Sequence, residues 1–186
     1  IDRDFRGNII IGDRTVEKPN KECSMVFQEP RLLPWLTIEE NIKFGIFPEA
    51  KIGQNRIREV LRLLNLEDFK NSYPNQLSGG MAQKVSIARA LVNAPDVLLL
   101  DEPFAAIDAL TKIKLQEEVA NLFRERKTTV LMVTHDFEEA LYLSDKIFVM
   151  SRRPGKIIKS FDINLPQPRN RNGKDFLNLH SKILTY

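Results

Sequence analysis

The sequence predicts an α/β fold with a largely parallel sheet. Segments suited to strands alternate along the chain with segments of helical periodicity, and the strands expected at 97–100 and 129–133 are apolar rather than alternating. Continuously apolar strands are typical of a sheet covered on both faces by helices. Residues 36–93 contain no convincing strand, so we expect them to form a helical subdomain inserted between two strands.

The bulk composition indicates one ordinary globular domain. The chain has 186 residues, of which 42% are hydrophobic and 28% charged, enough for a single well-formed core. We expect one domain over 1–186, with the helical subdomain at 36–93 and a C-terminal hairpin and helix at 146–186. The 28 basic and 25 acidic side chains nearly balance, and no basic run is interleaved with aromatics. Nucleic acid is therefore not an expected partner.

Signals for the cell compartment are few. Cys23 is the single cysteine, so no disulfide can form within the chain, which fits a reducing compartment. The longest apolar stretches fall far short of the roughly 20 residues that span a bilayer, and no signal-peptide pattern occurs. The sequence begins with Ile1 rather than Met, and we expect the natural N-terminus to lie outside it.

The first quarter of the chain predicts two strands and a short helix. Residues 7–12 form a β-branched run between glycines, which indicates an edge strand followed by a turn. Residues 24–27 indicate a buried strand that ends at Gln28, and Pro30 and Pro34 then turn the chain. Thr37 is suited to cap a helix over Ile38–Phe44.

Helices follow up to residue 93, and the alternation then resumes. Apolar residues at 57, 60, 61 and 64 predict an amphipathic helix, Pro74 breaks the chain, and another helix is expected at 81–92. Beyond it we expect strands at 97–100, 129–133 and 146–150 and helices at 110–126 and 137–143. The turn at 153–156 predicts a hairpin to a strand at 157–163, and a short amphipathic helix ends the chain.

Two adjacent carboxylates follow the strand at 97–100. Asp101 and Glu102 lie at the carboxyl end of a strand, where open parallel sheets bind ligands. There Asp101 could hold Mg²⁺, through water, and Glu102 could polarise a water that attacks a γ-phosphate. Taken alone, these residues suit a strand followed by a charged helix cap equally well.

Two further polar residues also follow strands. Gln28 ends the strand at 24–27, where a neutral amide can bind Mg²⁺ or water and can release it when a loop moves. His135 follows the strand at 129–133, where it could hydrogen-bond the γ-phosphate and hold the attacking water. Taken singly, a glutamine at a strand end is weak evidence for a functional site, and His135 is better explained as a helix cap or a core histidine.

A helix start with two glycines is the most informative segment. Ser78, Gly79 and Gly80 open the helix expected at 81–92, where free N–H groups and the helix dipole favour a phosphate. Ser-Gly-Gly also begins ordinary capped helices, and Asp108 equally suits a cap for the helix at 110–126. The joint occurrence of all these segments in one order favours the functional interpretation.

Together these segments resemble the ATP-binding cassette (ABC) ATPases. That resemblance implies a P-loop NTPase-like α/β fold with a mostly parallel sheet and a helical subdomain. Residues 77–83 resemble the signature motif, 97–102 Walker B and 105–108 the D-loop, while Gln28 resembles the Q-loop glutamine and His135 the switch histidine. Residues 27–35 and 151–157, and Met81 in the signature, are similar to ATP-binding subunits of nitrate, sulfonate and taurine importers.

The resemblance implies that two subunits share each ATP. In this family one subunit's signature serves the ATP held by its partner, so a homo- or heterodimer is expected. Glu102, His135 and Gln28 would be catalytic, and Asp101 and Gln28 would bind Mg²⁺. Five residues would bind nucleotide across the dimer: Ser78, Gly79, Gly80, Gln83 and Asp108.

The resemblance also implies a membrane partner. Transmembrane permease subunits would dock near Glu29, Leu32, Leu33 and Trp35, although Leu33 suits packing inside the helical subdomain nearly as well. A substrate-binding protein would act indirectly. The chain would lie peripherally on the cytoplasmic face of the membrane and energise import of a small anionic solute.

The phosphate-binding loop of this family is absent from the sequence. No Gly-x-x-x-x-Gly-Lys-Ser/Thr occurs; Gly7 and Gly12 have the spacing, but Asp13 and Arg14 follow. A shortened form of an intact subunit, a truncated gene product and a segment missing from the structure would each explain this, and we favour an incomplete copy. By itself this polypeptide is expected to hydrolyse ATP poorly.

Two rival functions share part of this pattern. A non-catalytic interaction module derived from an ABC cassette would dimerise or dock without turnover. A soluble ABC ATPase of the DNA-repair or translation-factor type is disfavoured, because only the 48 residues of 29–76 separate Gln28 from Leu77 and leave no room for a coiled-coil arm.

Overall fold

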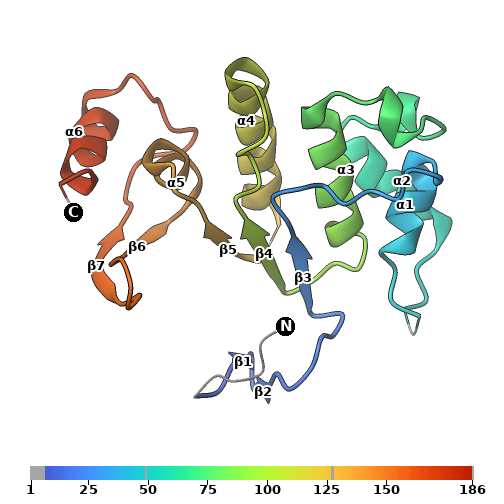
Figure 1. Cartoon of the computed structure of the whole chain (residues 1–186), viewed down its shortest axis with the longest axis horizontal. Helices are drawn as coiled ribbons and strands as arrows, with labels where there is room; N and C mark the ends of the chain where they lie inside the picture. The colour runs from blue at the N-terminus through green and yellow to red at the C-terminus, as the bar shows by residue number, and fades with distance from the viewer. Residues whose placement is uncertain (1–6, 49, 127, 186) are drawn as a thin grey trace. The chain divides into compact units, whose positions relative to one another are not determined.

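The computed structural model describes residues 7–48, 50–126 and 128–185. The start of the expected domain, residues 1–6, lies outside this range. The chain forms two compact units, one ending at Val133 and the other beginning at Thr134. Figure 1 shows the elements of both.

A three-stranded parallel sheet forms the centre of the first unit (Figure 1). β4 (Val97–Asp101) pairs with β3 (Cys23–Val26) on one side and with β5 (Thr129–Val133) on the other. Ahead of it, β1 (Ile10–Ile11) pairs antiparallel with β2 (Arg14–Thr15) across a turn in which Gly12 has φ +57°. The predicted parallel sheet and the preceding strand and turn are confirmed.

The two faces of this sheet are buried to different extents. Leu98 and Leu100 are 0% and 2% exposed, whereas Met25 is 43% and Leu131 55% exposed. Met25, Leu99 and Leu131 are paired across the three strands, so the exposed side chains share one face and the buried ones the other. The prediction that these strands are buried throughout is wrong for the exposed face.

Helices fill the segment between β3 and β4, as predicted. They are α1 (Ile38–Phe44), α2 (Gln54–Leu63) and α3 (Gly79–Leu91), with short 3-10 turns η1 (Glu67–Phe69) and η2 (Pro74–Gln76). Apart from residue 49, which is not described, the segment contains no strand. α1 and α2 contact α3, which contacts β3, and Figure 1 shows α3 between the sheet and the other two helices. α4 (Ala109–Glu125) joins β4 to β5 and contacts α3.

The second unit combines two helices with a hairpin. α5 (Phe137–Leu143) precedes β6 (Lys146–Met150) and β7 (Ile157–Asp162), which pair antiparallel, and α6 (Lys174–Ile183) follows. The predicted hairpin and C-terminal helix are thus confirmed. Arg169 donates to the carbonyls of Leu141 (2.8 Å), Tyr142 (3.0 Å) and Ser144 (2.8 Å), which closes the end of α5. Among the described residues, no helix has the length and apolar character needed to cross a bilayer.

Candidate functional site

Glu102 occupies a constrained position directly after β4. Its backbone has φ +43°, in the left-handed region that residues other than glycine seldom adopt. Its N–H donates to the carbonyl of Val133 at 2.9 Å, which ties this turn to the end of β5. Holding such a residue there costs about 1–3 kcal/mol, and strained residues of this kind cluster at functional sites.

Gln28 and Glu102 meet at the carboxyl edge of the sheet. They follow β3 and β4, which are neighbours in parallel register. Gln28 Nε2 donates to Glu102 Oε2 at 3.4 Å. The structure therefore brings together two predicted site residues that are 74 positions apart in the sequence.

The acid next to them suits a magnesium ion. Asp101 is the last residue of β4 and pairs with Val133. Carboxylate and amide oxygens are ligands that Mg²⁺ accepts, and Mg²⁺ commonly takes only one or two carboxylates while water and phosphate supply the rest. No group of three or more His, Cys, Asp and Glu among the described residues could hold a metal. The oxygens of Asp101 and Gln28 have the ligand chemistry that Mg²⁺ accepts, and their binding of Mg²⁺ stays a prediction.

His135 belongs to the second unit, in the turn before α5. Thr134 Oγ1 accepts the N–H of Asp136 at 3.1 Å and donates to Glu139 Oε2 at 3.0 Å. Asp136 caps α5 by accepting the N–H of Glu139 at 3.1 Å. Within its own unit, the turn that carries His135 is therefore held by three local hydrogen bonds.

The two glycines of the signature segment have different surroundings. Ser78 caps α3 by accepting the N–H of Met81 at 3.3 Å, so the helix begins at Gly79, two residues before the predicted start. A β-carbon at Gly80 would lie 2.5 Å from Thr111 Cγ2 on α4, whereas one at Gly79 would lie 3.7 Å from the Ala106 carbonyl oxygen. The close approach of α3 to α4 therefore requires glycine at 80.

Asp108 is the N-cap of α4. Its Oδ1 accepts the N–H of Thr111 at 3.1 Å. Hydrogen bonds from the Thr111 side chain and N–H lower the pKa of Asp108. Asp108 is interpreted from the sequence either as a helix cap or as a nucleotide-binding residue, and the structure contains the cap. The cap lies beside the start of α3.

Gln83 is enclosed in the first unit. It is 2% exposed, and its Nε2 donates to the carbonyl of Phe27 at 3.3 Å. The side chain is buried on α3, and its expected contact with nucleotide stays a prediction. In this structure Gln83 supports the residue that precedes Gln28.

Two residues outside every motif hold the segment after Gln28. Arg89 on α3 donates to the carbonyls of Pro30 at 2.7 Å and Arg31 at 2.8 Å, and burial lowers the pKa of its guanidinium. Asn41 on α1, fully buried, accepts the N–H of Leu33 at 2.8 Å and donates to its carbonyl at 3.1 Å. An arginine and an asparagine among apolar helix positions were the available signals in the sequence.

The expected docking segment is partly exposed. Trp35 is 70% exposed and Glu29 is also exposed, whereas Leu32 and Leu33 are half-buried. Phe44, the last residue of α1, is 66% exposed and was not predicted to be part of any surface.

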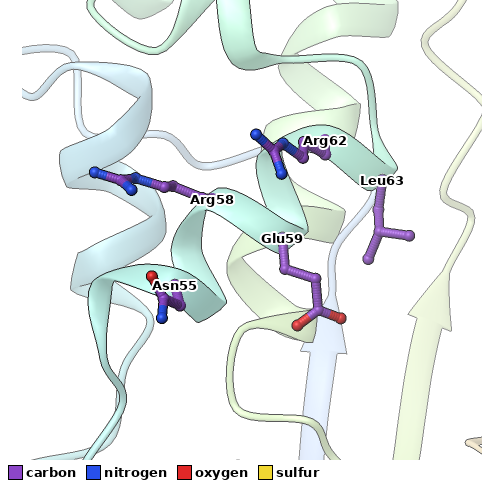
Figure 2. A pocket seen from close by; sticks show the side chains of 5 residues that line it. All are labelled: Asn55, Arg58, Glu59, Arg62 and Leu63. Atoms are coloured by element: carbon purple, nitrogen blue, oxygen red, sulfur yellow. The ribbon is translucent and has the colours of Figure 1, made fainter.

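A shallow pocket on α2 contains none of the predicted site residues. Figure 2 shows the side chains that line it, which are Asn55, Arg58, Glu59, Arg62 and Leu63. Glu59 points away from Arg58 and Arg62 and pairs with Arg56 and Arg126, each at 2.8 Å. This ion-pair cluster links α2 to the C-terminal end of α4.

Comparison of the sequence with known proteins identifies relatives over nearly the whole chain. A family model described as ABC transporter matches residues 3–105. The aliphatic sulfonates import ATP-binding protein SsuB of Bacillus cereus (strain ZK / E33L) is 47% identical over 184 residues, which cover 99% of this chain and 73% of that protein. The uncharacterized ABC transporter ATP-binding protein MJ0412 of Methanocaldococcus jannaschii is 40% identical over 187 residues, covering 99% and 70%.

Solved structures with the same fold are also found. The ATP-binding cassette MJ0796, solved as a dimer in a post-hydrolysis state with ADP and Pi, has a TM-score of 0.70 and 31% identity, covering 88% of this chain and 76% of that chain. The cbiO1 protein of Clostridium perfringens, part of the transporter complex cbiONQ, has a TM-score of 0.67 and 28% identity, covering 76% and 57%.

Proposed function

Because the chain belongs to the ABC transporter family, whose ATP-binding proteins are transport-coupled ATPases, we propose that it is the ATP-binding and ATP-hydrolysing subunit of an importer for a small anionic solute. Its α/β fold is that of the ABC ATPase cassettes. The observation that carries the proposal is the contact of Gln28 with Glu102 at the carboxyl edge of the sheet. Relatives named as import ATP-binding proteins do not favour the alternative of a non-catalytic module.

At the sheet edge, we assign the hydrolytic step to Glu102. Its carboxylate takes a proton from the water whose oxygen bonds to the γ-phosphorus as the bond from that phosphorus to the leaving oxygen of ADP breaks. The amide of Gln28 orients that carboxylate. His135 holds that water by a hydrogen bond from the turn fixed by Thr134. Bound Mg²⁺ supplies charge neutralisation at the phosphate oxygens, and Asp101 and Gln28 are the residues that would hold it.

A second subunit completes the site in our proposal. Ser78, Gly79 and Gly80 offer a hydroxyl and N–H groups at a helix start to the nucleotide held by the partner, with Asp108 at the same interface. The solved dimer of MJ0796 supports such an assembly. Gln83 would bind nucleotide at the same interface, and its Nε2 also supports the carbonyl of Phe27.

We propose the domain organisation expected from the sequence. Residues 1–186 would act as one ABC ATPase domain with a helical subdomain at 36–93 and a C-terminal hairpin and helix at 146–186. Support comes from the helices between β3 and β4 and from the hairpin of β6 with β7.

Permease docking is proposed at the segment after Gln28. The exposed ring of Trp35, together with Glu29, Leu32 and Leu33, would receive the transmembrane subunits. The cbiO1 neighbour is part of a transporter complex, which supports a partner of this kind. A substrate-binding protein would act through the permease, and the chain would lie peripherally on the cytoplasmic face of the membrane.

ATP hydrolysis by the transport complex, reconstituted in lipid vesicles from subunits to which a phosphate-binding loop has been added, tests this function. Taurine, an alkyl sulfonate or nitrate should raise hydrolysis when the substrate-binding protein is present. Glu102→Gln should lower it by about 10²–10⁴-fold, whereas Glu117→Gln, which neutralises an exposed acid on α4, should not. Hydrolysis that responds to none of these solutes would overturn the solute class. Hydrolysis that survives Glu102→Gln would overturn the assignment of the base.

A further inference from the structure

We propose that Arg89 is a positioning residue that fixes the loop carrying Gln28 to the helix carrying residues 78–80, so that these two parts of the nucleotide site move as one body. The inference rests on the proposed function, because it gives this mechanical link a role in ATP hydrolysis. Its basis is the set of contacts between α3 and residues 27–31.

Arg89 holds two successive carbonyl groups of the loop. Its NH2 group donates to the carbonyl of Pro30 at 2.7 Å and its NH1 group to that of Arg31 at 2.8 Å. A planar guanidinium presents its donors in a fixed fork, so two bonds restrict both the position and the orientation of what it binds. The loop directly after Gln28 is therefore attached to α3.

Gln83 attaches the same loop on the other side of Gln28. Its Nε2 donates to the carbonyl of Phe27 at 3.3 Å. Gln83 and Arg89 are six residues apart on one helix, about 9 Å along its axis. Gln28 is thus placed between two attachments to α3, one before it and one after it.

The loop itself has a fixed shape. Arg31 adopts φ +47°, and its guanidinium lies over the Phe27 ring at 4.0 Å from the centroid, which is within cation–π range. The two ends of the segment therefore contact each other as well as α3. A segment closed in this way transmits a displacement of α3 to Gln28.

The C-terminal end of α1 also limits the space available to the Arg89 side chain. A β-carbon at Gly45, the C-cap of α1, would lie 2.5 Å from both Arg89 Cγ and the Arg89 carbonyl oxygen. The absence of a side chain at 45 leaves the room through which Arg89 reaches the loop. Because Gln28 in turn contacts Glu102 at 3.4 Å, the chain of contacts runs from α3 to the proposed base.

Arg56 offers a matched control. It donates to two carbonyls as Arg89 does, those of Leu91 at 2.7 Å and Val92 at 3.2 Å. These lie at the C-terminal end of α3 and not in the loop of Gln28. Arg56→Met should therefore destabilise the helical segment without freeing the loop.

The test is ¹⁵N relaxation of the Gln28, Glu29 and Arg31 amides in the full chain. We expect order parameters of about 0.85 for these amides in the wild type and below about 0.6 in Arg89→Met. Arg89→Lys should give intermediate values, and Arg56→Met should match the wild type. Unchanged values in Arg89→Met, or an equal fall in Arg56→Met, would overturn the inference. If Arg89→Met does not fold, Arg89→Lys decides by the same measurement.

Steady-state hydrolysis by the transport complex supplies the functional readout. Arg89→Met should lower kcat about tenfold and leave KM for ATP within about twofold, because a misplaced group weakens the reacting geometry more than ground-state binding. Arg89→Lys should restore part of kcat. A loosened loop with unchanged kcat would overturn the role in hydrolysis. Absence of hydrolysis in a complex whose ATP-binding subunits also carry an added phosphate-binding loop would contradict the proposed function, while the relaxation data would still decide the attachment.

Discussion

Among single residues, Gly80 shows most directly how one side chain sets the approach of two helices. Gly80→Ala should lower the free energy of unfolding by about 1–3 kcal/mol, because its β-carbon would meet Thr111 Cγ2 at 2.5 Å. Gly79→Ala, with its nearest atom at 3.7 Å, should be neutral or stabilising. Urea unfolding measures both.

A second-site change provides the control for Gly80. Thr111→Ser removes the methyl group that clashes and keeps the backbone N–H that Asp108 accepts. Added to Gly80→Ala, it should recover most of the lost stability. If the double variant is no more stable than Gly80→Ala, the clash is not the cause.

Asp108 provides a pH-dependent prediction for the start of α4. Its pKa is lowered from 3.8 in the folded chain, so its contribution to stability is present above the unfolded pKa and is lost as the pH falls through the folded pKa. The Thr111 amide, followed by NMR, should leave its capped environment only at a pH below the ordinary aspartate range. Asp108→Asn, which caps well and does not titrate, should abolish this transition. The same transition in Asp108→Asn would assign it to another group.

Residues recognised from sequence are those whose role is local or belongs to a motif. Ser78 and Asp108 suit caps from their immediate neighbours alone, and the structure has both as caps. Arg89 and Asn41 act on carbonyls far away in the chain, and nothing next to them in sequence indicates which groups they reach. Glu102 has a positive φ and donates a hydrogen bond to Val133, which is distant in the chain. The residues next to Glu102 in the sequence do not predict this conformation.

At the scale of elements, the unequal burial of the two sheet faces is the main physical finding. Leu98→Ala should lower the free energy of unfolding by about 2–5 kcal/mol, because it leaves a cavity in the core. Leu131→Ala, on the adjacent strand but 55% exposed, should cost less than about 1 kcal/mol. Equal losses in urea unfolding would mean that the exposed face is covered in solution.

Most elements follow from periodicity, and most errors lie at their ends. α1 and α5 begin and end where predicted, because Thr37 and the change of pattern after Asp136 mark their starts. β2 consists of two polar residues, so no alternation of apolar and polar residues predicts it as a strand. The apolar strands correctly predicted a parallel sheet. A continuously apolar sequence such as that of β5, however, does not indicate which face of the sheet is buried.

For the whole molecule, the exposed Trp35 marks the surface where we propose the permease docks. It is the single tryptophan of the chain, so with a permease whose tryptophans have been replaced its fluorescence reports on that surface alone. Assembly with the permease should shift its emission to the blue, and Trp35→Ala should weaken assembly at least about tenfold, as loss of a buried aromatic anchor does. Phe148→Ala, which removes an aromatic side chain 50% exposed on β6 of the second unit, should assemble normally. Unchanged emission on assembly would place the interface elsewhere.

The meeting of Gln28 with Glu102 shows what global topology adds to sequence. Each residue follows its own strand, and only the parallel pairing of β3 with β4 brings them to 3.4 Å. The family resemblance indicated their roles from motif order. Their hydrogen bond, and the attachment of the Gln28 loop to α3, depend on distant contacts that no motif contains.

Binding and hydrolysis of Mg·ATP test the central claim most directly, measured on the same samples of the transport complex, with a phosphate-binding loop added to both the wild-type and the Glu102→Gln subunits. The account predicts that Glu102→Gln binds Mg·ATP with affinity within about threefold of the wild type but releases phosphate about 10²–10⁴-fold more slowly. Equal rates of phosphate release from the two complexes would contradict it, because Glu102 would then not be the base.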